Sequence, residues 1–381
     1  MNFEFSTATR IIFGVDTFKR VGGLASGLGK KAFVLGGKNL DRLGPLLGQL
    51  EQPSITFSVP SEPSIPLILE GLNQAKTSGC DFVIAMGGGS VLDAGKAIAA
   101  LMTNPGEPLD YLEVVGKGQP LTNCAAPFIA IPTTSGTGSE VTSNAVLSVP
   151  EKQVKVSMRS PLMLPSIALV DPMLTYSLSK EITASTGLDA LTQCLEPFVS
   201  NQANPMTDGF CREGLKRAAR SLKCAYEFPD DEKAREDMSL ASLFGGLALA
   251  NAKLGAVHGF AGPLGGMMEA SHGSLCASLL PHVVEANIKA LRSRQSHSDT
   301  LSRYDEIAQI ITGKQTANAD DAVVWLQELC SSLEVPTLSE LGLTKDLIPE
   351  VVNKAQNASS MKGNPIVLSV DELTGILERA M

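Results

Sequence analysis

Strand-like runs alternate with helical patterns through the N-terminal half of the chain, and this alternation constrains the fold more than any other feature. Each run is short, rich in β-branched or aromatic residues, and bounded by glycine, proline or aspartate. The runs that we predict as buried strands cover residues 31–35, 54–59, 82–86, 128–131 and 167–170. Helical patterns lie between them, as in residues 65–76. Such alternation predicts a parallel sheet wrapped by helices.

After about residue 180 the strand-like runs stop and helical patterns follow one another. The predicted helices cover residues 181–199, 208–222, 231–254, 275–291, 304–312, 319–333, 345–358 and 370–379. We therefore predict an α/β domain over residues 1–179, followed by an all-helical domain over residues 180–381. In such an architecture, ligands bind at the carboxyl ends of the strands and in the cleft between domains.

Charge and composition argue against several classes of partner. A chain of 381 residues is long enough for two domains, and 44% hydrophobic residues are typical of a globular protein. The net charge of −9 argues against a nucleic-acid or anionic-membrane partner. There is no apolar run of about 18 residues, no secretory signal and no CxxC pair among the seven cysteines. We expect a cytoplasmic protein with reduced, buried cysteines.

A glycine-rich turn follows the third predicted strand directly, in Gly87-Gly88-Gly89-Ser90, and a helical pattern begins at Val91. Glycine lets backbone amides approach an anion closely, and a helix N-terminus adds partial positive charge. The turn is therefore suited to hold phosphate, although it matches neither GxGxxG nor a P-loop. The alternative is a glycine-rich turn without a ligand.

A second polar loop, residues 132–140, follows the fourth predicted strand and carries five hydroxyl side chains and two glycines. Two polar loops on neighbouring strands suit the phosphates and ribose of a dinucleotide, although hydroxyl-rich loops are often only solvated. The first predicted strand ends in Gly36-Gly37-Lys38-Asn39, without the acidic residue that would bond ribose hydroxyls and repel a 2′-phosphate. Lys38 offers a cation instead, which favours NADP slightly over NAD unless it is simply solvated.

A candidate metal site combines one acidic residue with two of the four histidines. Asp189 lies in an apolar helical pattern, where a carboxylate needs a partner, and Gln193 follows one turn later on the same face. His258 and His272 fall within one glycine-rich stretch. Asp plus two His is a competent catalytic set for a divalent ion, with a position left for substrate. Because no tight HxxxH spacing is present, the alternative is two separate hydrogen-bonded histidines.

Taken in order, these motifs resemble the iron-containing (group III) alcohol dehydrogenase family over nearly the whole chain. The matching features are Phe13-Gly14, Gly87-Gly88-Gly89-Ser90 with Asp93 and Lys96, residues 132–140, Lys155, Asp171-Pro172, residues 187–192, His258-Gly259, Pro263-Leu264-Gly265, His272-Gly273 and Gly363-Asn364-Pro365. The resemblance implies a Rossmann-like domain, a helical metal-binding domain and a metal in the cleft. It further implies hydride transfer between NAD(P)(H) and a small alcohol, aldehyde or ketone.

The resemblance also assigns site residues. Those expected at the cofactor, with the end of the first strand included, are Gly37, Gly88, Gly89, Ser90, Thr133, Thr134, Thr137, Asn144 and Lys155. Asp189, His258 and His272 are expected to hold Fe²⁺ or Zn²⁺ and to act in catalysis through it. The expected partners are a small alcohol or carbonyl substrate and a second copy of the chain, in a homodimer.

Two departures from the family pattern affect the metal site. The family usually has a His one turn after the Asp, where this chain has Gln193, and often a His four residues after His258, where it has Gly262. Gln193 can offer an amide oxygen as a fourth, weaker ligand. Alternatively, three ligands suffice, as in the zinc-using glycerol dehydrogenases, or the site holds metal poorly.

The expected reaction is hydride exchange at nicotinamide C4, with Lewis acidity from the metal stabilising alkoxide character on the substrate. The proton route is open, because Gly262 replaces a relay imidazole. The alternatives are a zinc-type polyol dehydrogenase, a dehydroquinate synthase-like enzyme, and a dinucleotide-binding protein with a degenerate metal site.

Overall fold

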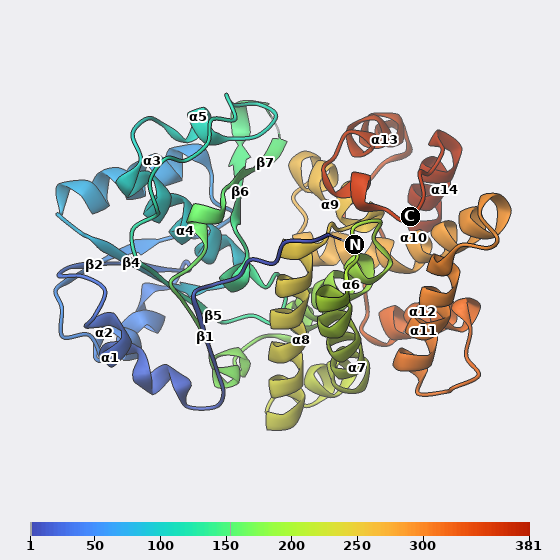
Figure 1. Cartoon of the computed structure of the whole chain (residues 1–381), viewed down its shortest axis with the longest axis horizontal. Coiled ribbons are helices and arrows are strands. Elements are labelled where there is room, and N and C mark those ends of the chain that lie inside the picture. The colour runs from blue at the N-terminus through green and yellow to red at the C-terminus, as the bar shows by residue number, and fades with distance from the viewer. Residues whose placement is uncertain (1, 153) are drawn as a thin grey trace. The chain divides into compact units, whose positions relative to one another are not determined.

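The computed structural model describes residues 2–152 and 154–381 and divides the chain into two compact units. The α/β unit comprises Ser6–Thr134 and Gly138–Tyr176, and the helical unit comprises the segment up to Phe5, Ser135–Thr137 and Ser177–Met381. The middle of the loop over residues 132–140 therefore belongs to the helical unit, whereas both of its ends belong to the α/β unit. Each unit is described by itself below (Figure 1).

A parallel sheet of six strands forms the centre of the α/β unit (Figure 1). Its strands are β1 (Arg10–Phe13), β2 (Ala32–Gly36), β3 (Ser54–Ser58), β4 (Phe82–Gly87), β5 (Phe128–Pro132) and β8 (Ile167–Val170), in the order β1-β8-β5-β4-β2-β3. The predicted α/β fold with a parallel sheet is confirmed. The strand order reverses between β2 and β4, and this reversal point is where open α/β sheets bind ligands.

Helices cover both faces of this sheet. They are α1 (Val21–Ala25), α2 (Gly44–Leu47), α3 (Ile65–Thr77), α4 (Gly89–Thr103) and α5 (Pro108–Tyr111). Along β2, Phe33 and Leu35 enter the core beneath α3 and α4, whereas Ala32 and Val34 enter the core beneath α1 and α2. Because both faces of the sheet are buried, the strands read in the sequence as continuous apolar runs.

A hairpin that the sequence analysis did not predict lies against α4. Its strands are β6 (Asn144–Val149) and β7 (Val154–Arg159), which pair antiparallel. Polar and half-exposed residues alternate with buried ones in both strands. Neither strand therefore shows the continuous apolar run by which the central strands were recognised.

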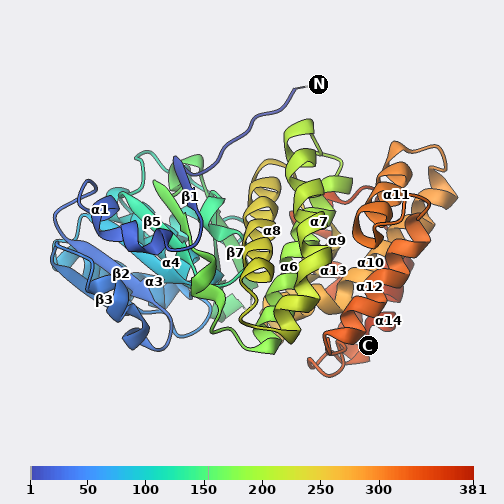
Figure 2. The same cartoon turned by 90° about the horizontal axis from the view of Figure 1, so that it is seen from below.

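The helical unit consists of nine long or medium helices in its described residues (Figure 2). They are α6 (Lys180–Val199), α7 (Pro205–Glu227), α8 (Glu232–Asn251), α9 (Ala256–Met267), α10 (His272–Arg294), α11 (Asp299–Thr312), α12 (Ala319–Ser332), α13 (Ile348–Gln356) and α14 (Val370–Ala380). Helices α6, α7 and α8 pack side by side in both views. The predicted helical second half is confirmed.

Helix α9 was not among the predicted helices, because the sequence analysis described residues 257–266 only as part of a glycine-rich stretch. Glycine and an internal proline, here Pro263, disfavour helix in isolation. Burial of Val257, Phe260 and Leu264 at helical spacing outweighs that preference. A Cβ atom at Gly259 would lie 2.9 Å from Met361, so this glycine allows a close approach between segments.

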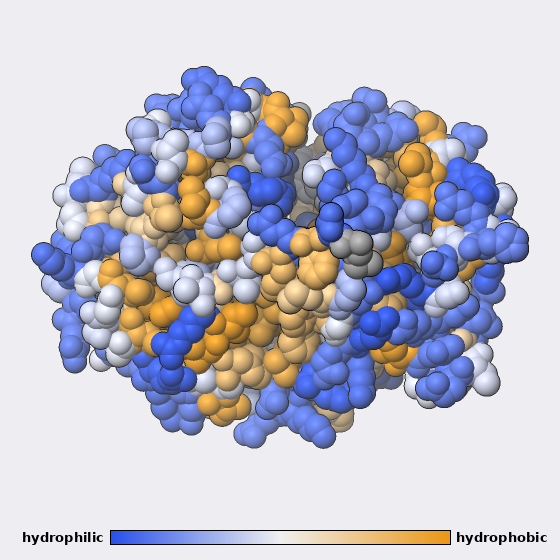
Figure 3. Space-filling model, in the orientation of Figure 1, coloured by the Kyte–Doolittle hydropathy of each residue, from blue (hydrophilic) through white to orange (hydrophobic). Residues whose placement is uncertain are grey.

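The outer helices of the helical unit are amphipathic. Helices α11, α12 and α14 bury one apolar face each and expose charged residues on the other, and this part of the surface is mostly hydrophilic on the right of Figure 3. Across the described residues, no individual helix has the length and apolar character needed to cross a membrane; only the bent pair α8 and α9 passes that test jointly, by length and composition.

Candidate active site

Asp189 is the buried centre of a polar cluster in the helical unit. It lies on α6 with only 2% of its surface exposed, among apolar residues that pack against α7 and α8. Its Oδ1 atom accepts no hydrogen bond, although His258 Nε2 lies 3.3 Å away. A buried carboxylate oxygen without a hydrogen bond costs free energy, which indicates that another partner belongs there.

Four donor side chains converge at this point from three helices. Asp189 comes from α6, His258 from α9, and His272 and Cys276 from α10. One ligand atom from each lies within 4.8 Å of all the others. His272 Nε2 lies 3.8 Å from Asp189 Oδ1 and 3.6 Å from Cys276 Sγ. The structure thus brings the three predicted metal ligands together and adds a cysteine that the sequence analysis missed.

Glu196 fixes the orientation of His258. Its Oε2 atom accepts a hydrogen bond from His258 Nδ1 at 2.7 Å, and its Oε1 atom accepts one from the Val257 backbone at 2.7 Å. With the Nδ1 proton committed to Glu196, the neutral form of His258 would present its Nε2 lone pair toward Asp189. A carboxylate behind a histidine in this arrangement is typical of metal sites.

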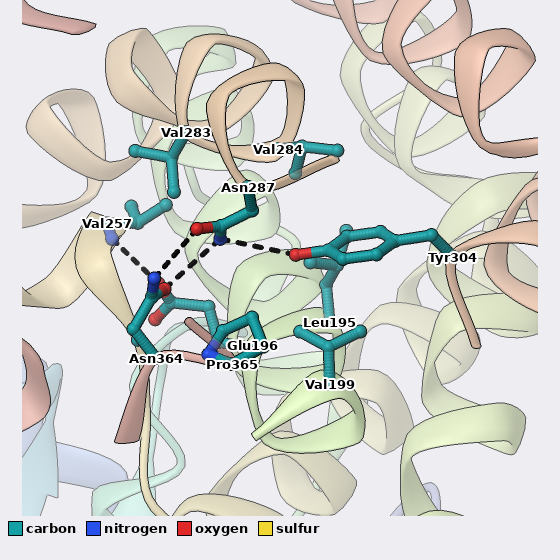
Figure 4. A pocket seen from close by; sticks show the side chains of 11 residues that line it. Leu195, Glu196, Val199, Val257, Val283, Val284, Asn287, Tyr304, Asn364 and Pro365 are labelled. Carbon is teal, nitrogen blue, oxygen red and sulfur yellow. Dashed lines mark hydrogen bonds between the residues drawn. The ribbon is translucent and has the colours of Figure 1, made fainter. Parts of the chain in front are cut away.

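A buried amide pair holds the start of α9 beside Glu196 (Figure 4). Asn364 accepts a hydrogen bond from the Ala256 backbone at 3.1 Å and exchanges hydrogen bonds with Asn287. Asn287 also donates to the Tyr304 hydroxyl. The pair explains why Gly363-Asn364-Pro365 belongs to the motif set although it lies far from His272 in the sequence: it positions the helix that carries His258.

The four donors shift one another's protonation. Burial raises the pKa of Asp189 and of Cys276, but the facing imidazoles outweigh burial and leave both pKa values below their ordinary values. The Cys276 sulfur raises the pKa of His272 to about 9. Burial lowers the pKa of His258, yet Cys276 and Asp189 raise it well above its ordinary value. A divalent cation bound by the Asp189 carboxylate, a Cys276 thiolate and two neutral imidazoles would give a cluster without net charge.

The remaining predicted ligand, Gln193, also faces this region from α6. Its amide group lies against Asp189 and helps to lower the pKa of that carboxyl. Its Oε1 atom is buried without a hydrogen-bond partner. Two oxygen acceptors, one from each of these side chains, are therefore buried and unpaired in the same part of the unit. No surrounding atom lies within 4 Å of a Cβ added at Gly262, so that position leaves open space.

The second candidate site lies at the carboxyl edge of the sheet. Gly88 sits between β4 and α4, and the Thr133 backbone donates to the Gly87 carbonyl at 2.9 Å. A Cβ atom at Gly88 would lie 3.4 Å from Thr134. The structure therefore brings the glycine-rich turn and the start of the hydroxyl-rich loop together, and Gly89 and Ser90 begin α4. Gly37 follows β2, the neighbouring strand across the reversal point.

The other predicted cofactor residues are more dispersed. Asn144 and Lys155 lie on the β6–β7 hairpin, where Lys155 is ion-paired with Glu62. Thr137 belongs to the residues of its loop that group with the helical unit. Lys38 is exposed beyond the end of β2.

Helix α4, which begins at the glycine-rich turn, carries an ion pair between a buried lysine and a half-buried aspartate. Lys96 is fully buried, and its Nζ lies 3.1 Å from Asp93 Oδ1 and 2.8 Å from the Thr142 hydroxyl, and it also bonds the Asn144 carbonyl. Asp93 accepts two more hydrogen bonds, from the Ser139 hydroxyl and the Val146 backbone. The pair ties the hairpin and the loop to the helix that begins at the turn.

Both parts of the chain match one family of known proteins. The profile of the iron-containing alcohol dehydrogenases matches residues 8–172, and that of the C-terminal part of the same family matches residues 183–381. The chain is 32% identical to 1,3-propanediol dehydrogenase of Klebsiella pneumoniae over 99% of its own length and 98% of that protein. It is 32% identical to choline dehydrogenase of Bacillus subtilis over 98% and 94%, respectively. The structure of a 1,3-propanediol oxidoreductase superposes with a TM-score of 0.93 at 31% identity, with full coverage of both chains.

Proposed function

The chain belongs to the iron-containing alcohol dehydrogenase family, and we propose that Asp189, His258 and His272 hold its catalytic metal. It is an NAD(P)-dependent oxidoreductase that interconverts small alcohols and carbonyl compounds. The family uses iron, and zinc is an alternative. A sulfoacetaldehyde reductase structure in complex with NAD⁺ is among its structural neighbours, and an NADPH-dependent butanol dehydrogenase is among its relatives.

One observation carries the metal assignment. The cluster combines a carboxylate, two imidazoles and a thiol within 4.8 Å, and Asp189 Oδ1 and Gln193 Oε1 are buried there without hydrogen bonds. Buried acceptors without donors cost free energy, and a cation bound beside them would remove that cost. The residues present therefore fit a divalent metal ion.

Each residue has a defined task in the proposed mechanism. A divalent ion bound in this cluster supplies Lewis acidity toward the substrate oxygen. Glu196 keeps His258 in the tautomer with a free Nε2. The amides at the start of α4 would bind the dinucleotide pyrophosphate. Gly262 provides no imidazole for proton transfer, so we propose that the proton reaches solvent through water.

We propose the following residues as contacts of the dinucleotide: Gly37, Gly88, Gly89, Ser90, Thr133, Thr134, Thr137, Asn144 and Lys155. Support comes from the position of the first five beside the reversal point between β2 and β4. The division of labour between a dinucleotide-binding domain of residues 1–179 and a metal-binding domain of residues 180–381 is part of the same proposal.

Replacing a proposed ligand tests the metal assignment. His272→Ala should lose most bound metal and lower kcat/KM for a primary alcohol more than about 100-fold. Removing a metal ligand should lower metal affinity at least as much as removing a group that only orients a ligand. The measurements are elemental analysis of the purified protein and an NAD(P)H assay with short aldehydes. The exposed His297→Ala is the matched control and should keep both properties. Full occupancy and normal turnover in His272→Ala would reject the assignment.

The coenzyme preference has its own test. Since no acidic residue follows β2, we propose that NADPH binds at least as tightly as NADH. A Cβ atom at Gly37 would contact nothing, so Gly37→Asp is sterically tolerated there. The variant should weaken NADPH relative to NADH about tenfold by repelling the 2′-phosphate. Calorimetry of wild type and variant with both coenzymes measures this; tighter NADH binding by the wild type would contradict the proposal.

We also propose a homodimer in a reducing compartment such as the cytoplasm. The compartment is supported by the seven cysteines, all of which are free thiols. The expectation that all of them are buried is wrong, because Cys124 is exposed and Cys224 and Cys330 are half-buried. The homodimer remains a prediction, which light scattering coupled to size-exclusion chromatography measures directly.

A further inference from the structure

Cys276 is the member of the cluster that neither the motifs nor the family pattern assigned. It lies one helical turn after His272 on α10, is fully buried, and points its sulfur at both imidazoles. Sγ lies 3.6 Å from His272 Nε2 and 3.9 Å from His258 Nε2. No other cysteine takes part in such a group within residues 2–152 and 154–381.

The distances among the four donors match those around a tetrahedral ion. Bonds of about 2.0–2.3 Å from zinc to oxygen, nitrogen and sulfur keep the ligand atoms roughly 3.3–3.8 Å apart. The observed separations are 3.3 and 3.8 Å from Asp189 Oδ1 to the two imidazoles, and 3.6 and 3.9 Å from Cys276 Sγ to the same atoms. These four separations are thus close to the spacing in a coordination shell, and the other two are within 4.8 Å.

We propose that Cys276 is the fourth protein ligand of the metal and replaces the imidazole that is lost at position 193. The inference rests on the proposed function and names the donor set of the same site: one carboxylate, two imidazoles and one thiolate. Gln193 then lies beside the shell, with its amide against Asp189. A thiolate is a soft ligand that suits Zn²⁺ better than Fe²⁺, so this chain is a zinc enzyme within a family named for iron.

The donor set has consequences for retention of the ion. The Asp189 carboxylate and a Cys276 thiolate together neutralise the charge of a divalent ion. One carboxylate with neutral ligands would leave a net positive charge in the site. In a buried site the compensated arrangement binds more tightly. The ion is therefore expected to resist chelators although Gln193 replaces an imidazole.

Spectroscopy of the metal tests the sulfur ligand without depending on activity. The metal-free wild type loaded with Co²⁺ should show a near-ultraviolet thiolate-to-cobalt charge-transfer band, and the Zn²⁺ form should show one sulfur scatterer at about 2.3 Å by X-ray absorption. Cys276→Ser should lose both signals and at least about 100-fold in Zn²⁺ affinity, measured against a chromophoric chelator. Cys194→Ser is the matched control, because Cys194 is equally buried but bonds the Ala241 carbonyl, and it should keep both signals.

The outcomes separate this inference from the proposed function. A Zn²⁺ or Co²⁺ spectrum of the wild type with nitrogen and oxygen ligands only overturns the Cys276 assignment and leaves the metal-dependent dehydrogenase intact. A wild type that binds neither ion overturns both. Gln193→His supplies a further arm: unchanged Zn²⁺ dissociation supports the sulfur ligand, whereas much slower dissociation would mean that the wild-type shell lacks a strong fourth donor.

Discussion

Each unit buries a charged side chain within a polar group, Lys96 in the α/β unit and Asp189 in the helical unit. The two groups differ in how their hydrogen bonds are satisfied. In the α/β unit, Lys96 meets a carboxylate, a hydroxyl and a carbonyl, and Asp93 accepts three donors. In the helical unit, Asp189 Oδ1 accepts no hydrogen bond, although three further donor side chains surround it. Protein atoms alone satisfy the first group, whereas the second keeps a buried carboxylate oxygen without a hydrogen bond, as expected of the proposed cation site.

This difference separates a structural ion pair from a binding site. Both groups are buried and both shift pKa values, so neither burial nor titration distinguishes them. The hydrogen-bond inventory does distinguish them, because evolved protein interiors leave few buried acceptors without donors. The contrast predicts that substitutions in the first group affect folding and that substitutions in the second affect metal binding.

The largest expected effect is on folding, from Lys96→Met. Removing one partner of a buried pair leaves Asp93 and the Asn144 carbonyl without their cation, which should lower the free energy of unfolding of the α/β unit by about 3–5 kcal/mol. Urea unfolding followed by circular dichroism should show an earlier transition. The fluorescence of the single tryptophan, Trp325 on α12, reports the helical unit and should move little.

The control for this prediction is an exposed ion pair in the same unit. Lys117 pairs with Asp110 at 2.7 Å, but its side chain is 68% exposed, so Lys117→Met should cost under about 1 kcal/mol. Lys96→Met should also keep full Zn²⁺ binding. Loss of Zn²⁺ binding by Lys96→Met without a loss of stability would contradict the distinction between a structural ion pair and a metal site.

A second effect, of roughly 3 kcal/mol, should appear as a pH dependence of stability. Burial raises the pKa of Glu140 to about 7 from 4.5, with Lys96 opposing the shift. Because the folded pKa is the higher one, the stabilisation is complete below pH 4.5 and is lost as the pH rises through about 7. Glu140→Gln should lose less stability between pH 5 and pH 8 than the wild type does, as measured by urea unfolding. Identical pH profiles of the free energy of unfolding in the two proteins would show that ionisation of Glu140 does not destabilise the folded state.

The sequence predicted five of the six strands of the central sheet for a physical reason and missed β1, an edge strand that is only partly buried. Strands buried on both faces must be apolar at every position, as β4 is, and such runs stand out. The β6–β7 hairpin covers a helix and exposes alternate residues, so it left a weaker pattern. Helix α9 was missed because its stability comes from packing around Gly259 and not from the preferences of its residues.

The candidate metal site was predictable only in part. Asp189, His258 and His272 were found because their residue types and motifs indicate metal binding. Cys276 was missed although it lies four residues after His272 on one helix, because a single cysteine at that spacing is not a metal-binding motif by itself. That α6, α9 and α10 bring these side chains together is a property of tertiary packing, which local patterns do not contain.

The smallest expected effect separates a ligand from the residue behind it. In Glu196→Gln, the amide oxygen can still accept a hydrogen bond from the Val257 backbone. The amide NH₂ group then faces His258 Nδ1 and cannot accept the hydrogen bond that Nδ1–H donates to Glu196. His258 then loses the partner that fixes its tautomer, and Zn²⁺ affinity should fall about 10–100-fold, less than for Cys276→Ser. Chelator competition measures the loss, and Glu306→Gln, in an exposed pair with Arg212, should show none. Unchanged affinity in Glu196→Gln would restrict Glu196 to holding the start of α9. An intermediate loss of Zn²⁺ affinity with the cobalt–sulfur band intact would show that metal binding depends on an acceptor that contacts a ligand and not the ion.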